Sequence, residues 1–343
     1  MTTGSATAVT GIAVVLLFSV VERFAEKASP PGSLSMNVEG EHETEQKEKT
    51  MKHNTHIYLA VKSIEMMLEG VHKLKSTTLT ADAKVLQRML YTYRDSIREA
   101  SWAPDDILND KVQFHTFKLF TDKEFPKSKQ YAKEIYAQNY YRTSGGGGVA
   151  FKVDHLAHVL ADMNKLRIYN DRCSMEQIMN YFFLLTHYIA DAHVPMHCDL
   201  RDDPPSEGDT TKPRNGIFFP ESLHGKIESL WDDAVMPLAL VQQMIEKSSS
   251  DDTGKETELT KYVKFDVLLK NDREEINPAR IKDSLMQFVI DICIRSKERS
   301  LDLFPLDNPQ NYDPQKFKTA TRKIFAECIS NIISVWMWIW VKR

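Results

Sequence analysis

Residues 175–199 read MEQIMNYFFLLTHYIADAHVPMHCD, and this stretch decides the class of fold. Apolar side chains recur through residues 175–192 over a length that suits a helix. His187 and Asp191 are four residues apart, so a helix places them on one face. Pro195 ends the helix because proline lacks a backbone N–H, and the chain beyond it can bring His197 back toward the other two side chains. The stretch therefore predicts a helix that carries a potential metal-binding pair.

The helical pattern continues on both sides of this stretch. Apolar residues with helical spacing cover 56–74, 81–100, 127–141, 150–167, 222–245, 281–303 and 314–340. Alternation typical of strands is hard to find, and the sequence contains no internal repeat. A glycine run at 145–148 and polar stretches at 199–220 and 246–258 break the pattern. We therefore expect an all-α fold, a single domain of eight or more helices with the functional site in a cleft between helices.

The composition sets limits on function. The 343 residues are 42% hydrophobic and 27% charged, as in a folded globular protein, and the net charge is -4. Because no basic excess is present, binding of duplex nucleic acid by a charged face is disfavoured. The four cysteines are widely spaced without a C-x-x-C pair, so neither a cysteine zinc site nor a dense disulfide framework is indicated. A bound phosphate would need something other than Lys and Arg to hold it.

Three regions are expected along the chain. Residues 1–21 carry no charge and include the apolar run GIAVVLLFSVV at 11–21, which has the length of a signal-peptide core. An uncleaved membrane anchor and a disordered tail are the alternatives, because no Lys or Arg precedes the run and no small-x-small cleavage site follows it. Residues 22–52 have the composition of a disordered linker, and the helical domain covers 53–343. We expect a secreted or membrane-anchored protein outside the cytoplasm, with a cytoplasmic location left open.

Tryptophan is concentrated at the end of the chain. The segment ISNIISVWMWIWV at 329–341 holds three of the five tryptophans. It is too short to span a bilayer comfortably, so a core helix is the first interpretation and an interfacial lipid contact the second. We expect Trp231, Trp336, Trp338 and Trp340 to lie in the core, since aromatic residues at helical spacing usually do.

A second histidine–carboxylate pair follows the Pro-rich loop. In SLHGKIESLWDD, His224 and Glu228 are again four residues apart. Zinc takes imidazole nitrogen and carboxylate oxygen at about 2.0–2.2 Å, so pairs on helical faces can chelate it without distorting the backbone. The run DHLAHVLAD offers a rival group in His155, His158 and Asp162, but no third donor follows it after a helix break, so a partly buried helix face is favoured there.

These residues resemble a known family, the bacterial zinc-dependent phospholipases C and the related single-strand-specific zinc nucleases. The family motif is a His, an Asp four residues later, a His six residues after that, and then His-x-x-x-Glu in phospholipases or His-x-x-x-Asp in nucleases. All five positions are filled here. The segments HNTHIYLAVKSIEMM and WAPDDILNDKVQFH are also similar to family segments, and they match His56, Asp105 and His115. The resemblance covers about residues 52–343, including the Trp-rich end.

The resemblance implies up to three zinc ions, two of them expected and the third possible. Asp105 is both a ligand and the candidate catalytic residue, with Asp106 as its competitor for the ligand role. His193 points off the ligand face, although the nucleases often have His there, and is expected to lie behind the ligands or in solvent. The implied groups are Asp105, His115, His187 and Asp191 for one ion, His197, His224 and Glu228 for a second, and His56 with the shared Asp191 for a third.

The sequence departs from the family in two places. The third ion of the family is also held by the amine and carbonyl of a mature N-terminal tryptophan, and no Trp precedes Trp102 here. Choline-preferring phospholipases place an aromatic residue after the matching Asp, where this chain has Asp106, so a choline preference is not supported.

Three functional hypotheses follow from these residues. The first is a phosphoric-ester hydrolase, a phospholipase C that acts on phospholipids at a membrane surface by a metal-activated water. The second is a single-strand-specific nuclease, for which alone nucleic acid would be the partner. The third is a non-catalytic zinc-binding protein of the same fold. No protein partner is inferred.

Overall fold

The computed structural model describes residues 53–72, 76–108, 110, 114–120, 148–170, 173–205, 207, 217–235, 276, 278–282 and 284–342. The predicted N-terminal apolar segment, the linker, the helix at 127–141, most of the glycine run and the polar stretch at 246–258 lie outside these residues. The predictions made for them concern parts of the chain that are not described below.

The described residues confirm the all-α prediction. They form eight α-helices and contain no strand, only an isolated bridge between Leu119 and Asp199. The helices are α2 (His53–His72), α3 (Thr77–Thr92), α4 (Ile97–Asp106), α6 (Gly148–Asn170), α7 (Met175–His193), α8 (Glu221–Ala234), α11 (Leu285–Leu303) and α12 (Pro314–Val341). Short 3-10 helices η1 (Arg94–Ser96), η4 (Met196–Cys198), η5 (Leu200–Asp202) and η6 (Pro278–Arg280) lie between them.

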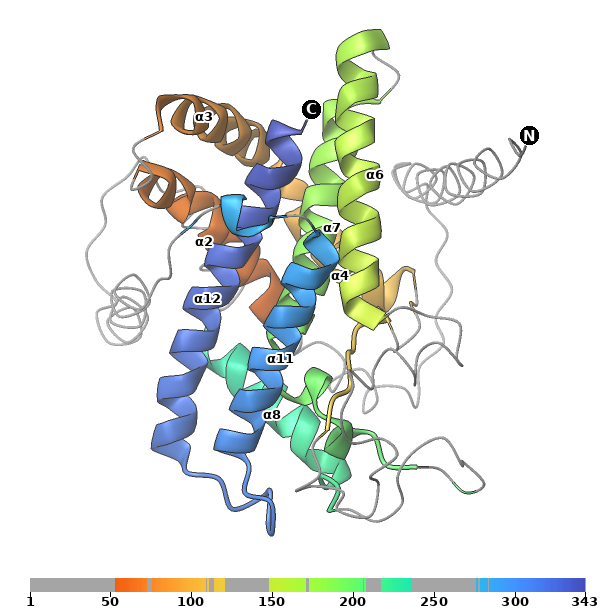
Figure 1. The fold of residues 1–343 in the computed structure, drawn as a ribbon, viewed down its shortest axis with the longest axis vertical. Helices are drawn as coiled ribbons and strands as arrows, with labels where there is room; N and C mark the ends of the chain where they lie inside the picture. The colour runs from red at the N-terminus through yellow and green to blue at the C-terminus, as the bar shows by residue number, and fades with distance from the viewer. Residues whose placement is uncertain are drawn as a thin grey trace, which may run out of the picture. The chain divides into compact units, whose positions relative to one another are not determined.

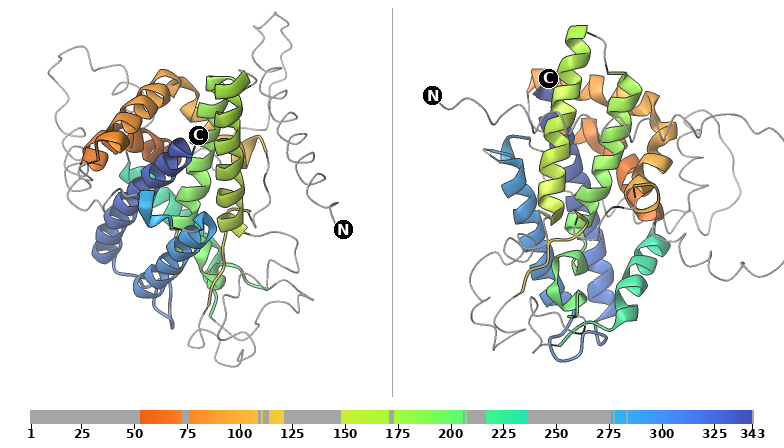
Figure 2. Two further views of the ribbon diagram at one scale, coloured as in Figure 1. Left: turned by 45° about the horizontal axis from the view of Figure 1, so that its top comes forward. Right: turned by 90° about the vertical axis from the view of Figure 1, so that its right-hand side faces the viewer.

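Helix α7 is the central element. It packs against α2, α3, α4, α6, α11 and α12, and Figures 1 and 2 show it enclosed by these neighbours. Every residue from Phe182 to His193 is buried. A helix buried all round cannot have the polar stripe of a surface helix, which is why its sequence is apolar on nearly every face. Polar residues on such a helix require specific partners, and His187 and Asp191 are two such polar residues.

Both ends of α7 are fixed by local sequence. Ser174 and Gln177 form a capping box: the Ser174 hydroxyl accepts from the Gln177 N–H at 3.1 Å, and the Ser174 N–H donates to the Gln177 side chain at 3.1 Å. At the other end Val194 is extended, as the residue before a proline prefers to be. The chain then turns through η4, which carries His197. The predicted end of the helix near Pro195 is confirmed.

The loop after α7 is held against α11 by buried charges. Asp199 pairs with Arg201 at 2.8 Å and with Lys297 at 2.8 Å, and the Ser300 hydroxyl donates to it at 2.5 Å. Arg201 also donates to the Phe304 carbonyl at 3.1 Å. Because every charge in this network has a partner, its burial does not leave an uncompensated ion.

The prediction for α8 is wrong at its end. A single helix was expected over residues 222–245, but α8 stops at Ala234 because the backbone of Val235 is extended, with ψ of 164°. The Val235 N–H donates to the Asp232 carbonyl and closes the last turn. The rest of the predicted run, residues 236–245, lies outside the residues that the structure describes.

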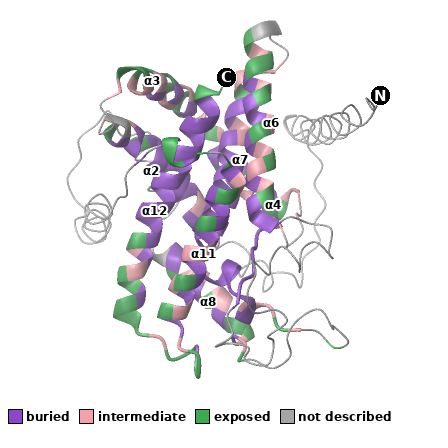
Figure 3. Ribbon diagram, in the orientation of Figure 1, coloured by how far each residue is buried: buried purple, intermediate pink, exposed green. Residues whose placement is uncertain are grey.

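Helix α12 forms the other half of the core. It begins at Pro314 behind the N-cap Asp313 and is buried from Ile324 to Trp340 (Figure 3). By length and composition it could cross a membrane, but 94% of its most apolar window is buried inside the protein. The four tryptophans expected in the core are all buried. The core-helix interpretation is therefore confirmed.

We predict that Trp336→Ala lowers the free energy of unfolding by about 3–5 kcal/mol, because the ring is fully buried and its removal leaves a cavity. The ring packs edge-on against Phe182 and Phe183, and its Nε1–H donates to the Phe182 carbonyl at 3.2 Å. Urea unfolding measures the change. Val341→Ala at the exposed end of α12 is the control and should change stability by less than about 0.5 kcal/mol. Equal effects would mean that α12 is not a core helix.

Candidate metal centre

Asp191 lies at the centre of the candidate site. It is 2% exposed, and its two oxygens face different histidines. Its Oδ2 lies 2.8 Å from His115 Nδ1 and 3.2 Å from His187 Nε2. Its Oδ1 lies 3.5 Å from His197 Nδ1 and 3.8 Å from His56 Nε2. One carboxylate thus joins four imidazoles that come from four separate segments of the chain.

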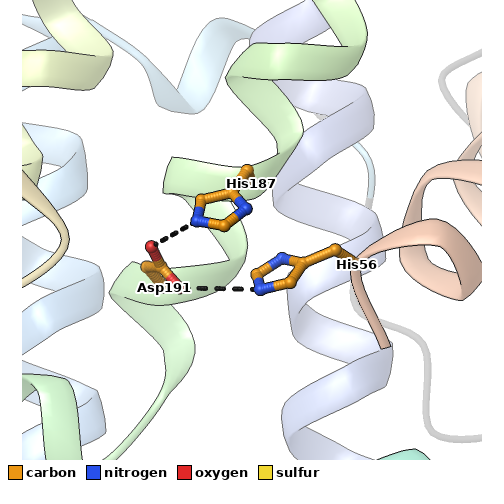
Figure 4. Close-up of side chains that lie close together, drawn as sticks. All are labelled: His56, His187 and Asp191. Atoms are coloured by element: carbon orange, nitrogen blue, oxygen red, sulfur yellow. Dashed lines mark ion pairs between the residues drawn. The ribbon is translucent and has the colours of Figure 1, made fainter. Parts of the chain in front are cut away.

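The first group consists of His56, His187 and Asp191. Figure 4 shows His56 entering from α2 while the other two project from α7, with ion pairs from both rings to the carboxylate. The rings of His56 and His187 are stacked with centroids 4.0 Å apart. His187 Nδ1 lies 2.8 Å from the Ser101 carbonyl, which can only accept, so Nδ1 carries the proton and Nε2 is left for the cluster.

The second group consists of Asp105, His115 and His187. Asp105 is at the C-terminal end of α4, and its Oδ1 lies 3.7 Å from both His115 Nδ1 and His187 Nε2. Its side chain is 41% exposed, the highest value among the eight predicted ligands. Asp106 is exposed and belongs to no such group among the described residues. The structure thus brings Asp105, rather than its neighbour, to the histidines.

The third group consists of His197, His224 and Glu228. His224 Nε2 lies 2.9 Å from Glu228 Oε1 and 3.2 Å from His197 Nε2, and His197 Nε2 lies 3.6 Å from the same carboxylate oxygen. The pair on α8 has the i and i+4 spacing read from the sequence. His197 reaches it from η4, beyond the end of α7.

Backbone pairing holds the segment at 114–120 to the loop after α7. The Phe117 N–H donates to the His197 carbonyl at 3.0 Å, and the Leu119 N–H donates to the Cys198 carbonyl at 2.9 Å. These bonds bring His115 beside the cluster. No periodic pattern in the sequence marks this pairing, because it is a short contact between two loops.

Asp232 holds the start of α2 against α8. Its Oδ1 accepts from the Thr55 N–H at 3.0 Å and from the Thr55 hydroxyl. The first N–H groups of a helix have no partner within the helix, so this carboxylate acts as a cap supplied from another element. It fixes His56, the next residue, relative to Glu228 one turn back on α8. Burial raises the pKa of Asp232 to about 6.

Burial and charge oppose each other within the cluster. Burial alone would raise the pKa of Asp191, but attraction to His187 and His197 outweighs it and holds that pKa well below its usual range. Burial alone would lower the pKa of His187, but Asp191 and then Asp105 raise it to about 9. Burial, followed by repulsion from His187, lowers the pKa of His56 to about 3. Without an ion, the cluster therefore keeps one imidazole charged and another neutral.

These side chains fit a metal ion by geometry and by donor type. In each of the three groups, one ligand atom per residue lies within 4.8 Å of the others, and all donors are imidazole nitrogens or carboxylate oxygens. One of the ring nitrogens that face the carboxylates, His197 Nδ1, is buried without a hydrogen-bond partner, 3.5 Å from Asp191 Oδ1. The grouping differs in two respects from the implied one: His187 belongs to two groups rather than one, and Asp191 belongs to one group rather than two.

A small cavity of about 30 Å³, with room for about one water molecule, lies beside the first and third groups. Its lining includes the candidate ligands His56, Asp191 and Glu228 together with the apolar side chains of Leu59, Trp231 and Phe325. Apolar surface therefore lies directly beside candidate ligands.

For His193 the structure decides between the two alternatives, and the prediction for His155, His158 and Asp162 needs correction. His193 does not face solvent: it is buried, with Nδ1 2.7 Å from the Ile189 carbonyl and Nε2 3.0 Å from Asn331 Nδ2. His155, His158 and Asp162 are exposed rather than partly buried, although the His158 ring contacts Trp338 of α12 edge-on, with centroids 5.4 Å apart. None of these four belongs to a candidate metal group among the described residues.

Sequence reasoning missed two polar side chains that touch the site. Asp202 Oδ2 lies 2.7 Å from His224 Nδ1, and Lys118 Nζ lies 3.0 Å from the same oxygen. A signal was present in retrospect, since Asp202 lies in a loop between two candidate ligands. Acidic residues are common in such loops, so the signal had no specificity.

No protein-family model matches the sequence, and no curated protein matches it. Among solved structures, the chain is similar in fold to the alpha toxin from Clostridium absonum. The TM-score is 0.46 at 14% sequence identity, over 85% of this chain and 64% of the toxin chain. The chain thus spans less than two thirds of the toxin, and the likeness is a weak one of fold alone.

We predict that Asp191→Asn destabilises the metal-free protein in a pH-dependent way, by about 3–5 kcal/mol at most, because it breaks a buried ion pair. The attraction is complete between about pH 4 and pH 6.5, above the ordinary pKa of an aspartate and below that of a histidine. The attraction is lost when the pH falls through the depressed pKa of Asp191. It is also lost when the pH rises through about 9, the pKa of His187.

Urea unfolding of chelator-treated protein at pH 6 and pH 10 measures this effect. The difference between wild type and Asp191→Asn should be smaller at pH 10 than at pH 6. Asp162→Asn is the matched control, because Asp162 is exposed and pairs only with Lys165 among the ion pairs of the described chain. A loss that is equal at both pH values would contradict the ion-pair account.

Proposed function

We propose that the protein is a zinc-dependent phosphodiester hydrolase, a phospholipase C that acts on phospholipids. The observation that supports the proposal is the convergence of eight histidine and acidic side chains into three groups around Asp191. Their spacing along the chain also resembles the motif of the zinc-dependent phospholipases C. Three adjacent groups could hold more than one ion, which is the arrangement that suits displacement at phosphorus.

The chain's own residues have separate tasks in this proposal. Zinc held by these groups would neutralise phosphate oxygens and lower the pKa of a bound water toward neutrality. His187 and Asp191 are buried and hold fixed positions on α7. Asp105 is the candidate catalytic residue, because it is the most exposed member of the second group and its carboxylate can accept a proton from an incoming water. A net charge of -4 is no obstacle, since ions rather than basic side chains would bind the phosphate.

Two observations favour a lipid substrate. Glu228 occupies the position where phospholipases of the similar family have Glu and the nucleases have Asp. Apolar side chains, namely Leu59, Trp231 and Phe325, lie beside the candidate ligands His56, Asp191 and Glu228, as the apolar part of an amphiphilic ester would require. The feature that suggested a nuclease, His193, is hydrogen-bonded inside the core. Nuclease activity is therefore an outcome of the test rather than a second proposal.

We predict that the purified protein binds at least two zinc ions per chain and releases diacylglycerol from phosphatidyl vesicles. Metal analysis and a lipid-release assay measure the two properties, and single-stranded DNA and RNA are assayed in parallel. Nucleotide release without diacylglycerol would replace the lipid proposal by the nuclease. Fewer than two zinc ions would make the hydrolytic mechanism untenable and leave a zinc-binding protein without catalysis.

We predict that His197→Ala and Asp191→Ala each abolish activity, while His158→Ala retains activity near that of wild type. The first two remove donors of different groups, whereas His158 lies on the exposed face of α6 with Nδ1 2.8 Å from the Asp154 carbonyl. Initial rates at saturating zinc measure the effect, and circular dichroism checks that each variant is folded. Equal losses in all three variants would show that the helix face carrying Asp191 has been wrongly identified as the metal-binding face.

A further inference from the structure

Asp202 and Lys118 form a buried ion pair behind the group of His197, His224 and Glu228. The carboxylate side chain is 9% exposed and the ammonium side chain 4% exposed, and their charged atoms lie 3.0 Å apart. Asp202 ends η5, while Lys118 lies in the segment that pairs with the loop after α7. Neither residue belongs to any candidate metal group in the part of the chain that the structure describes. Both nonetheless contact the elements that carry the candidate ligands.

The bond from Asp202 determines which nitrogen of His224 faces the group. His224 Nδ1 lies 2.7 Å from Asp202 Oδ2, and an ionised carboxylate only accepts hydrogen bonds. Nδ1 therefore carries the proton, and Nε2, which lies 2.9 Å from Glu228 and 3.2 Å from His197, is the nitrogen left to bind an ion. In the other tautomer, a proton on Nε2 would point into the group and compete with the ion.

Lys118 connects the same carboxylate to the other histidine of the group. Its Nζ donates to the Met196 carbonyl at 2.9 Å, directly before His197. The adjacent Phe117 N–H donates to the His197 carbonyl. One ammonium thus holds Asp202 in place and fixes the backbone that presents His197. Because a buried carboxylate is costly without a counter-charge, Lys118 also keeps Asp202 ionised and able to accept from His224.

We infer that Lys118 and Asp202 are positioning residues that hold His224 Nε2 toward the metal and set the affinity of the His197–His224–Glu228 group for zinc. The inference rests on the proposed function only in taking that group as a metal site. It adds two residues that no ligand pattern identifies. A carboxylate behind a metal-bound imidazole changes metal affinity by about 10- to 100-fold in such sites.

Asp199 is a control for the possibility that Asp202 only anchors the loop. Asp199 is three residues earlier and fully buried, and it holds the same loop to α11 through Arg201 and Lys297. It contacts no candidate ligand side chain among the described residues. Loss of the loop's anchorage and loss of the bond to His224 can therefore be separated.

The experiment compares Asp202→Asn, Lys118→Met and Asp199→Asn with wild type. Zinc affinity is measured at pH 7 by competition with a chromophoric chelator. The tautomer of His224 is read from the nitrogen shifts of ¹⁵N-histidine-labelled, metal-free protein at pH 10, where the ring is neutral. We expect Asp202→Asn to weaken one zinc site by about 10- to 100-fold and to shift His224 toward the Nε2–H tautomer, with Lys118→Met changing both in the same direction.

Asp199→Asn is expected to lower stability without changing the His224 tautomer. Lys118→Arg, which keeps the charge, should restore most of the zinc affinity lost in Lys118→Met. Unchanged affinity and tautomer in Asp202→Asn would overturn the inference, as would the same changes in Asp199→Asn. If wild type binds no zinc, the proposed function fails, while the tautomer of metal-free His224 still decides whether Asp202 positions it.

Discussion

The burial of one carboxylate, that of Asp191, is the constraint on which the rest of this structure depends. An ionised carboxylate inside a helical core is costly unless charged or polar partners surround it. Its partners are imidazoles from α2, the segment at 114–120, α7 and η4. No single segment could satisfy it. The four segments must therefore pack together around Asp191. The packing that satisfies this carboxylate is also the packing that forms the site.

The scaffold around this carboxylate is suited to holding it still. Helices α7 and α12 are buried along most of their length, and α7 itself carries His187 and Asp191. Ligands on buried helices have few alternative positions, which is the state a metal centre requires before an ion binds. The loop carrying His197 is the exception, and buried ion pairs at Asp199 and Asp202 compensate for its irregular backbone.

The cluster is uneven in its exposure. His187 and Asp191 are enclosed, whereas the side chains of Asp105 and His224 are 41% and 25% exposed. Ions bound among the buried residues would therefore stabilise the fold as well as take part in the proposed hydrolysis. The reaction itself would take place where water can enter.

The sequence by itself determined the helical class, the end of α7 at Pro195 and both i, i+4 pairs, because these depend on residues close together in the chain. It also pointed to His56 and Asp105, through resemblance to a known family. Only the tertiary structure decided that His193 lies in the core and that Asp202 and Lys118 stand behind His224. Such partners lie tens of residues apart, and local periodicity has no information about which distant side chains packing brings together.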